Sequence, residues 1–266
     1  MAGIDENRTY WADYDWPKGG DEWSRPWGGT PSVWYGVLLP RLHRWLPAGT
    51  VLEIGAGFGR WTDYLRNVAD RVIAVDIVEK CVAHCRQRFA DSNVESYVND
   101  GQSLSMVLPD SVDLVFSYDS LVHCDATAIG AYLREFARVL TPNGIGFVHH
   151  SNIGVYAAAL RRGHRLNRRV NRWVSRLGIT AVNGSWRAED MTAERFAALS
   201  REAGLACIAQ EILPWGPAPP LLRDCLSTFT RGDSIWARPN RVRTNWDFLR
   251  EQRYLAERAS LYAPDR

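Results

Sequence analysis

The chain has 266 residues, of which 46% are hydrophobic and 23% are charged, and its formal net charge is +2. This composition is typical of a globular domain, and the small net charge gives no overall attraction to nucleic acid or to a membrane surface. The chain has no run of 18 apolar residues, and its acidic, aromatic start differs from a secretory signal, so we expect a cytoplasmic protein without a transmembrane helix.

Residues 1–46 predict an N-terminal, Trp-rich arm or lid. Residues 1–30 have no hydrophobic period and predict irregular structure, whereas residues 32–46 have helical spacing despite Pro40. Six of the 12 tryptophans lie in this part of the chain: Trp11, Trp16, Trp23, Trp27, Trp34 and Trp45. Two interpretations stay open, because these rings can anchor the arm to the main domain or form a stacking surface for a sugar or an aromatic ligand.

Strands and helices alternate through residues 47–152, which predict a cofactor-binding core. Short apolar segments predict strands at 51–55, 71–77, 94–100, 112–119 and 145–151, with helices at 60–69, 79–90 and 126–140. Strands that are apolar on both faces are typical of a parallel sheet covered by helices on both sides. The five cysteines form no CxxC pair, so we expect free thiols at Cys81, Cys85, Cys124, Cys207 and Cys225.

Residues 153–190 predict a helical cap insertion that is rich in arginine: Arg161, Arg162, Arg165, Arg168, Arg169, Arg172, Arg176 and Arg187. The insertion is either a solvated basic helix pair or a cap that holds an acidic or polyhydroxylated acceptor through guanidinium groups. The same charges could contact RNA phosphates, but the chain has neither an overall basic balance nor a known RNA-binding module.

Residues 191–266 complete the core with a helix from Thr192 to Gly204, strands at 205–213 and 223–230, and a C-terminal helix at 244–262. The strand count is therefore seven. The sequence predicts an α/β, Rossmann-like fold with a seven-stranded, mostly parallel sheet and helices on both faces.

Three polar or glycine-rich segments follow the first three predicted strands. Gly55-Ala56-Gly57-Phe58-Gly59 comes directly after the first strand, where glycines let the backbone approach a ligand closely. Asp76 ends the second strand, where a carboxylate can accept both hydroxyls of a ribose, and Asp100-Gly101 follows the third, where an acid can meet an adenine amino group. All three lie at the carboxyl edge of the sheet, which is the usual ligand edge of open α/β folds.

The segments VLEIGAGFGR, VIAVD, VNDG, DLVFSYDSLVH and LREFARVLTPNGIGFVHHSN resemble the class I S-adenosylmethionine-dependent methyltransferases over about residues 51–152. The resemblance implies a seven-stranded sheet with an antiparallel last strand and S-adenosylmethionine as the cofactor. It places Gly55, Ala56 and Gly57 beside the methionine portion, Asp76 on the ribose, and Asp100 and Gly101 on the adenine. Glu53 matches the acidic position of the first motif, and the predicted cofactor site also includes Arg60, Ile77 and Ser117.

No N-P-P-Y-type motif follows the fourth strand, where the chain reads Ser117-Tyr118-Asp119-Ser120. This departure argues against methylation of a nucleic-acid or glutamine nitrogen.

The predicted acceptor side combines carboxylate and imidazole groups. Asp119 ends the fourth strand, His123 follows one turn later, and His149 and His150 end the fifth strand. We expect His149 or His123 to act as a general base, with Asp119 orienting it or binding a divalent cation. Adjacent strand residues point to opposite faces, so His149 and His150 should diverge unless the strand ends between them. A further expectation is a Mg²⁺ or Mn²⁺ site at Asp119, His149 and His150.

The segments FSYDSLVHCD, FVHHSN, SWRAEDMTAERF, EILPWG and DCLSTFTR together resemble bacterial sugar O-methyltransferases, including those that methylate mycobacterial-type polysaccharides. This resemblance implies methylation of a sugar or oligosaccharide hydroxyl. From the small net charge we expect no nucleic-acid or membrane partner.

Two alternatives stay open: an O-methyltransferase that acts on a phenol or natural product, and a binding protein that keeps the cofactor fold without catalysis. A sugar site predicts His and Asp around the acceptor with Trp on the rim, whereas a phenol site predicts a closed apolar pocket. The spacing of the glycines and the VNDG segment disfavour an NAD-dependent dehydrogenase.

Overall fold

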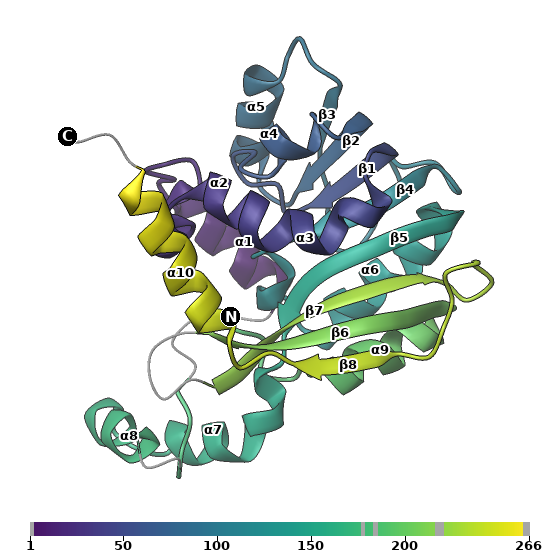
Figure 1. Ribbon diagram of the computed structural model, residues 1–266. Helices are drawn as coiled ribbons and strands as arrows, with labels where there is room; N and C mark the ends of the chain where they lie inside the picture. The colour runs from purple at the N-terminus through teal and green to yellow at the C-terminus, as the bar shows by residue number, and fades with distance from the viewer. Residues whose placement is uncertain (1–2, 177–178, 183–185, 216–220, 263–266) are drawn as a thin grey trace.

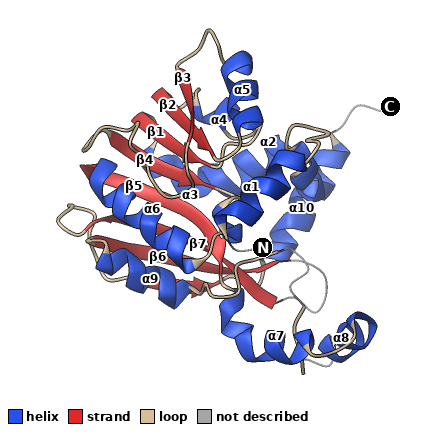
Figure 2. Cartoon of the chain, turned by 180° about the vertical axis from the view of Figure 1, so that it is seen from behind, coloured by secondary structure: helices blue, strands red, loops and turns tan. Residues whose placement is uncertain are grey.

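The computed structural model describes residues 3–176, 179–182, 186–215 and 221–262. Within them, one sheet of eight strands in the order β3-β2-β1-β4-β5-β7-β6-β8 carries helices on both faces (Figures 1 and 2). The strands are β1 (Ala48–Ile54), β2 (Ala69–Asp76), β3 (Val94–Val98), β4 (Val112–Ser117), β5 (Leu140–Ser151), β6 (Leu205–Trp215), β7 (Leu221–Arg231) and β8 (Arg241–Thr244).

The first five strands pair in parallel, and β7 is antiparallel to both β5 and β6. The predicted mostly parallel sheet is therefore confirmed, and the seven predicted strands correspond to β1–β7. The predicted count is wrong by one strand, because β8 adds a parallel edge next to β6. All four residues of β8 are exposed, so this strand has no buried apolar pattern by which the sequence could reveal it.

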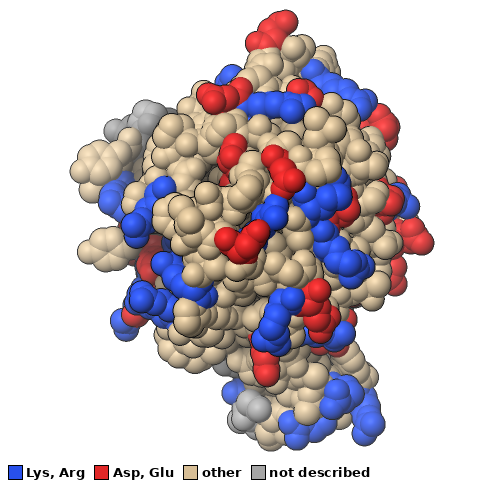
Figure 3. Space-filling view, turned by 90° about the vertical axis from the view of Figure 1, so that its right-hand side faces the viewer, with Lys and Arg blue, Asp and Glu red and all other residues tan. Residues whose placement is uncertain are grey.

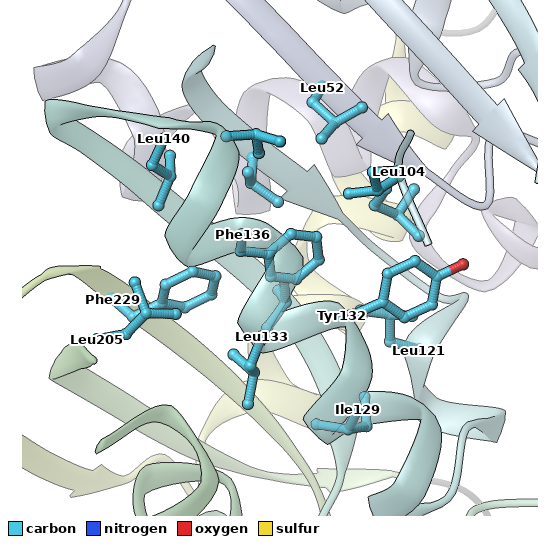
Figure 4. Packing of buried hydrophobic residues seen from close by; sticks show 14 of the residues in the cluster. Leu52, Leu104, Leu121, Ile129, Tyr132, Leu133, Phe136, Leu140, Leu205 and Phe229 are labelled. Carbon is cyan, nitrogen blue, oxygen red and sulfur yellow. The ribbon is translucent and has the colours of Figure 1, made fainter. Parts of the chain in front are cut away.

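The helices are α1 (Ile4–Asp13), α2 (Thr30–Val33), α3 (Leu39–Leu42), α4 (Thr62–Leu65), α5 (Glu79–Arg88), α6 (Ala126–Val139), α7 (Ala157–His164), α8 (Arg168–Ser175), α9 (Ala193–Glu202) and α10 (Phe248–Leu261). On one face of the sheet, α6 buries Ile129, Leu133 and Phe136, whose spacing repeats along one side of a helix. Figure 4 shows these side chains packed with Leu52 of β1 and Phe229 of β7. This packing fixes the strand ends that surround the site.

The opposite face is covered by the second half of the arm and by α10. Trp27 and Trp34 are buried in the cluster on this face, and the Trp27 ring lies 4.9 Å from the ring of Phe248. For these two tryptophans the anchoring interpretation is confirmed. The irregular structure predicted for residues 1–30 is wrong at α1. Asn7 is the one residue of α1 that is buried, so this helix has no apolar stripe that would mark it in the sequence.

The arginine-rich insertion forms α7 and α8, which project from the lower edge of the molecule in Figure 1. A small cluster of Ile153, Leu160 and Ala181 attaches α7 to the body of the protein. Among the described residues, no helix is long and apolar enough to cross a lipid bilayer.

The five cysteines are free, as expected, and all except the half-buried Cys124 are buried.

Candidate functional site

A cavity of about 400 Å³ lies at the carboxyl ends of β1, β2 and β4. Its walls include residues of the arm, the glycine-rich loop, the ends of β2 and β6, the turns after β3 and β4, α6 and the end of the insertion. The cavity therefore lies at the edge of the sheet that the sequence predicts, where ligands bind in open α/β folds. Its volume is within the range of small-molecule sites.

The glycine-rich loop forms the floor of one half of the cavity through Gly55, Ala56 and Gly57. Gly57 has a φ of +57°, and a Cβ atom at this position would lie 2.6 Å from the Trp16 ring. The position therefore requires glycine for its backbone conformation and for the close approach of the arm. The amide of Gly57 donates a hydrogen bond of 2.8 Å to Asp76 Oδ2.

Asp76 lines the cavity at the end of β2, as predicted. Its other carboxylate oxygen, Oδ1, accepts a hydrogen bond of 2.9 Å from the amide of Val78. Burial raises the pKa of Asp76 to about 6, although the amides of Gly57 and Val78 oppose this shift by stabilising the carboxylate. Each carboxylate oxygen keeps a lone pair that a ribose hydroxyl could use.

The far end of the cavity is lined by Ile77, Asn99 and Gly101. The predicted role of Asp100 is not matched by its position, because its side chain is exposed and does not line the cavity. Its carboxylate accepts hydrogen bonds from the amides of Gln102 and Ser103, at 2.8 and 2.7 Å, and so closes its own turn. The side chain that reaches the cavity from this turn is instead that of Asn99.

Two other predicted cofactor residues lie behind the cavity wall. Glu53 is buried, accepts a hydrogen bond of 2.5 Å from Thr62, and has a pKa raised to about 8 by burial. Ser117 is buried and donates to the carbonyl of Ile54, which ties β4 to β1. Both residues are buried beside the glycine-rich loop and do not line the cavity. Arg60, in contrast, lines the cavity as predicted.

A row of alternating charges lies at the acceptor end of the cavity. Arg60 donates to Asp119 Oδ2 at 3.0 Å, and Asp119 Oδ1 lies 3.3 Å from His149 Nδ1. On its other side, His149 Nε2 lies 3.4 Å from Asp224 Oδ2, a charge contact without hydrogen-bond geometry. Arg187 then closes the row with two hydrogen bonds of 2.8 Å to the Asp224 carboxylate.

The groups in this row shift one another's pKa values toward the ionised forms. Burial alone would lower the pKa of His149, but the carboxylates of Asp119 and Asp224 outweigh it and raise that pKa. Burial alone would raise the pKa of Asp119, but the neighbouring His149 and the charge of Arg60 lower it to about 2. The amide of Asp119 also donates a hydrogen bond of 3.3 Å to His149 Nδ1. His149 is fully buried and does not line the cavity, so it is placed to orient Asp119 rather than to contact an acceptor.

His123 is the predicted base whose imidazole lines the cavity. It lies on the turn after β4, and its Nδ1 donates to the carbonyl of Trp186 at 3.0 Å, which leaves Nε2 as a proton acceptor. Burial, followed by the charge of Arg187, lowers the pKa of His123 to about 4. The ring is therefore neutral at pH 7, which is the form that a general base requires.

The expected metal site at Asp119, His149 and His150 is wrong. His150 points to the opposite face of β5, as the alternation of strand side chains predicts, and its ring stacks on Phe196 with centroids 4.2 Å apart. Its two ring nitrogens are 2.9 Å from the Ser151 carbonyl and 2.8 Å from Ser227 Oγ. No group of three His, Cys, Asp or Glu side chains among the described residues could hold a metal ion.

Aromatic rings wall the cavity on the side of the arm. The tryptophans that line it are Trp11, Trp16, Trp23, Trp61, Trp186 and Trp215. The Trp11 ring lies 5.5 Å from the ring of His123, and Tyr10 lies 4.7 Å from Trp186. These six tryptophans therefore line the cavity, whereas Trp27 and Trp34 anchor the arm.

Backbone strain also concentrates at the cavity. Four non-glycine residues within the described ranges have a positive φ, and three of them line the cavity: Trp16 at 53°, Asp119 at 64° and Trp186 at 53°. Such conformations cost of order 1–3 kcal/mol each and persist at functional sites, where the surrounding structure enforces them. At Asp119 this conformation brings the carboxylate between Arg60 and His149.

Several polar atoms in the cavity wall lack a partner. Nine buried side-chain nitrogen or oxygen atoms of the described residues have no hydrogen bond, and five belong to cavity-lining residues: Asn7 Oδ1, Trp16 Nε1, Trp61 Nε1, Asn99 Oδ1 and Tyr118 Oη. Buried polar groups are nearly always paired, and a bound ligand is an ordinary source of missing partners. The cavity thus fits a polar, nucleoside-containing molecule, with Asp76 and Asn99 at one end and Arg60 at the other.

Sequence reasoning missed Asp224 and Asn99 and placed Arg187 only in the cap. Asp224 had a signal, since it is an acid within the apolar segment LLRDCLSTFT of β7, where a charge is buried only if it is paired. Asn99 comes directly before Asp100, the residue predicted to contact the adenine. The exposed arginines of α7 and α8 do not line the cavity, which favours the solvated helix pair for that part of the insertion.

Comparison with known proteins finds sequence similarity in the segment that contains the glycine-rich loop. Residues 51–144 match the sequence profile of a family described as a methyltransferase domain. A probable S-adenosylmethionine-dependent methyltransferase from Mycolicibacterium smegmatis is 34% identical over 117 residues, which are 44% of this chain and 43% of the relative. A protein of the same description from Mycobacterium tuberculosis is 38% identical over 44% of this chain and 40% of its own length. The chain thus matches about two fifths of the length of these relatives.

The fold has counterparts among solved structures. Magnesium protoporphyrin IX methyltransferase from Synechocystis PCC 6803, solved with bound S-adenosylhomocysteine, is 16% identical with a TM-score of 0.57, over 86% of this chain and 100% of that one. This likeness concerns the fold alone, whereas the family match concerns the segment that carries the glycine-rich loop, Asp76 and Asp119. Residues 51–144 of the chain are therefore similar in sequence to a methyltransferase domain.

Proposed function

We propose that the protein transfers a methyl group from S-adenosylmethionine to a hydroxyl of a sugar or oligosaccharide, in the formation of a methylated polysaccharide of mycobacterial type. The observation that carries the proposal is the neutral imidazole of His123 in a cavity walled by tryptophans. A sugar hydroxyl is a poor nucleophile that needs a base, and its apolar ring face packs well on indole rings.

The residues of the chain divide into two groups in this proposal. Asp76 and the loop at Gly55–Gly57 hold the nucleoside and methionine portions, and Arg60 lies at the methionine end. The cofactor, when bound, supplies an electrophilic methyl group on a sulfonium. His123 accepts the hydroxyl proton at Nε2, while Asp119, held by Arg60 and His149, orients the acceptor by hydrogen bonding. The indole rings exclude water from this end of the cavity.

A phenol or natural-product acceptor is the second candidate, and the many apolar rings of the cavity favour it. The two candidates differ in their need for a base, because a phenol has a pKa of about 10 and a sugar hydroxyl ionises far less readily. A non-catalytic binding protein would bind the cofactor and methylate neither class.

The test is transfer of a radiolabelled methyl group to a panel of mono- and oligosaccharides and to a matched panel of phenols. With a sugar acceptor, we expect His123→Ala to lower kcat by about 10²–10⁴-fold while S-adenosylhomocysteine affinity stays unchanged. His43→Ala is the matched control, since His43 is exposed and does not line the cavity. Methylation of phenols alone, or a small effect of His123→Ala, would contradict the sugar proposal.

A further inference from the structure

The helix α8 presents an apolar stripe that the fold does not bury. Val170 and Trp173 lie three positions apart on α8, and Leu166 comes just before its N-cap, Asn167. Leu166, Val170 and Trp173 are 38%, 49% and 64% exposed. The other side of the helix faces the body, because Asn171 accepts a hydrogen bond of 2.6 Å from Thr180. The stripe is therefore directed outward, although an aliphatic pair and a tryptophan in one row usually pack against something.

Arginines flank this stripe, in a segment of the sequence that contains no acidic residue. Exposed arginines on and beside α7 and α8 are Arg161, Arg162, Arg165, Arg169, Arg172 and Arg176. No Asp or Glu occurs between residues 152 and 188 of the sequence. Figure 3 agrees with this, because on the face in view the lowest part of the molecule carries basic side chains and no acidic ones. The net charge of the whole chain is small, so it does not reveal this local excess of positive charge.

An apolar stripe bordered by arginines is typical of a helix that binds the surface of a lipid bilayer. Amphipathic helices with this pattern lie in the interface of a bilayer, where apolar side chains enter the acyl boundary and basic groups contact anionic headgroups. Tryptophan favours the same depth. A second copy of the chain would bring like charges together, and RNA would pair with the arginines but leave Leu166 and Val170 in water.

We propose that the α7–α8 insertion docks the protein on a lipid bilayer with anionic headgroups, through the face formed by Leu166, Arg169, Val170, Arg172 and Trp173. The proposal departs from the expectation that the protein has no membrane partner. It is independent of the acceptor, since none of these five residues lines the cavity.

The test is flotation of the full-length protein with vesicles of phosphatidylcholine alone and of phosphatidylcholine and phosphatidylglycerol in equal parts. The wild type should float with the anionic vesicles and not with the neutral ones. Binding should weaken as salt is added, because screening shortens electrostatic attraction to about 10 Å at 0.1 M salt.

Two variants separate the two components of the surface. Arg169→Glu with Arg172→Glu should lower the partition coefficient at least about 25-fold, since each lost arginine accounts for about fivefold. Trp173→Ala should weaken binding at constant charge. The matched controls are Arg253→Glu with Arg258→Glu and Tyr254→Ala, because these residues are exposed on α10 instead. Circular dichroism and S-adenosylhomocysteine binding should be unchanged in every variant.

The proposal is overturned if the wild type does not float with anionic vesicles at low salt, or if the α8 variants float as well as the wild type. It is also overturned if an RNA oligonucleotide binds with the same arginine dependence while vesicles do not bind.

Discussion

Neutralising Asp224 should strongly destabilise the protein. Asp224 is fully buried, and its carboxylate receives two hydrogen bonds of 2.8 Å from Arg187, whose side chain is 6% exposed. Its other neighbour is His149, at 3.4 Å. Asp224→Asn keeps the shape of the side chain, but it leaves the buried Arg187 guanidinium without its counter-charge and removes a carboxylate beside the buried His149 imidazole. An amide group would also direct hydrogens toward these donors.

The expected magnitude follows from the cost of breaking a buried ion pair, about 3–5 kcal/mol of unfolding free energy. For a chain of this size that loss corresponds to a fall in Tm of roughly 6–20 °C. Urea unfolding, monitored by circular dichroism, measures the loss of unfolding free energy, and differential scanning calorimetry measures the fall in Tm. Asp233→Asn is the matched control, because Asp233 pairs with Arg231 on the surface, where such pairs contribute little.

The reasoning is refuted if Asp224→Asn unfolds at the same urea concentration and temperature as the wild type or the control. In that case the row of charges from Arg60 to Arg187 would not act as a structural unit, and the placement of Asp119 would need another cause.

Four further predictions concern titration and the glycine-rich loop. The pKa of His149 is raised, so its protonated form stabilises the fold below about pH 6.5, and this contribution is lost as the pH rises through the raised pKa. The stability gap between wild type and His149→Gln should therefore narrow as the pH rises above about 6.5; a constant gap contradicts this. Burial raises the pKa of Glu53 to about 8, so wild-type stability falls as the pH rises from about 4.5 to 8, and Glu53→Gln should flatten this slope without changing cofactor affinity. Gly57→Ala should lower S-adenosylhomocysteine affinity about tenfold, because the added methyl group meets Trp16 at a positive φ; unchanged affinity in calorimetry would argue against this floor of the cavity. Because burial raises the pKa of Asp76 to about 6, affinity for the same ligand should decrease as the pH falls through that value, and a flat profile would oppose the ribose contact.

The sequence predicts the sheet well because its strands are short, apolar on both faces and separated by amphipathic helices. The sequence does not predict the elements that lack a buried apolar pattern. The strand β8 is exposed along its whole length, and α1 contacts the cavity through residues such as Asn7 and Trp11 rather than through a hydrophobic stripe.

The site is predicted in part for a similar reason. Position at a strand end is visible in the sequence, so Asp76, Asp119 and His123 were found and do line the cavity. The direction of a side chain within a turn is not visible, and Asp100 folds back on its own turn while Asn99 faces the cavity. The strand position of His149 suggests a base. The antiparallel pairing of β5 and β7 places Asp224 next to His149, on the side away from Asp119.

The arm explains a further part of the site that spacing could not give. Trp16 packs against Gly57, and Asn7 donates a hydrogen bond of 3.0 Å to the carbonyl of His123. These contacts join residues more than 40 and 110 positions apart in the chain, a relation that only the folded structure reveals.

Calorimetric titration of the purified protein with S-adenosylhomocysteine, repeated with NAD and with the Asp76→Ala variant, tests whether this cavity binds the cofactor. We expect one site per chain for S-adenosylhomocysteine, no binding of NAD, and a marked loss of affinity in Asp76→Ala. Absence of S-adenosylhomocysteine binding, or binding that does not depend on Asp76, would contradict the assignment of this cavity as the cofactor site.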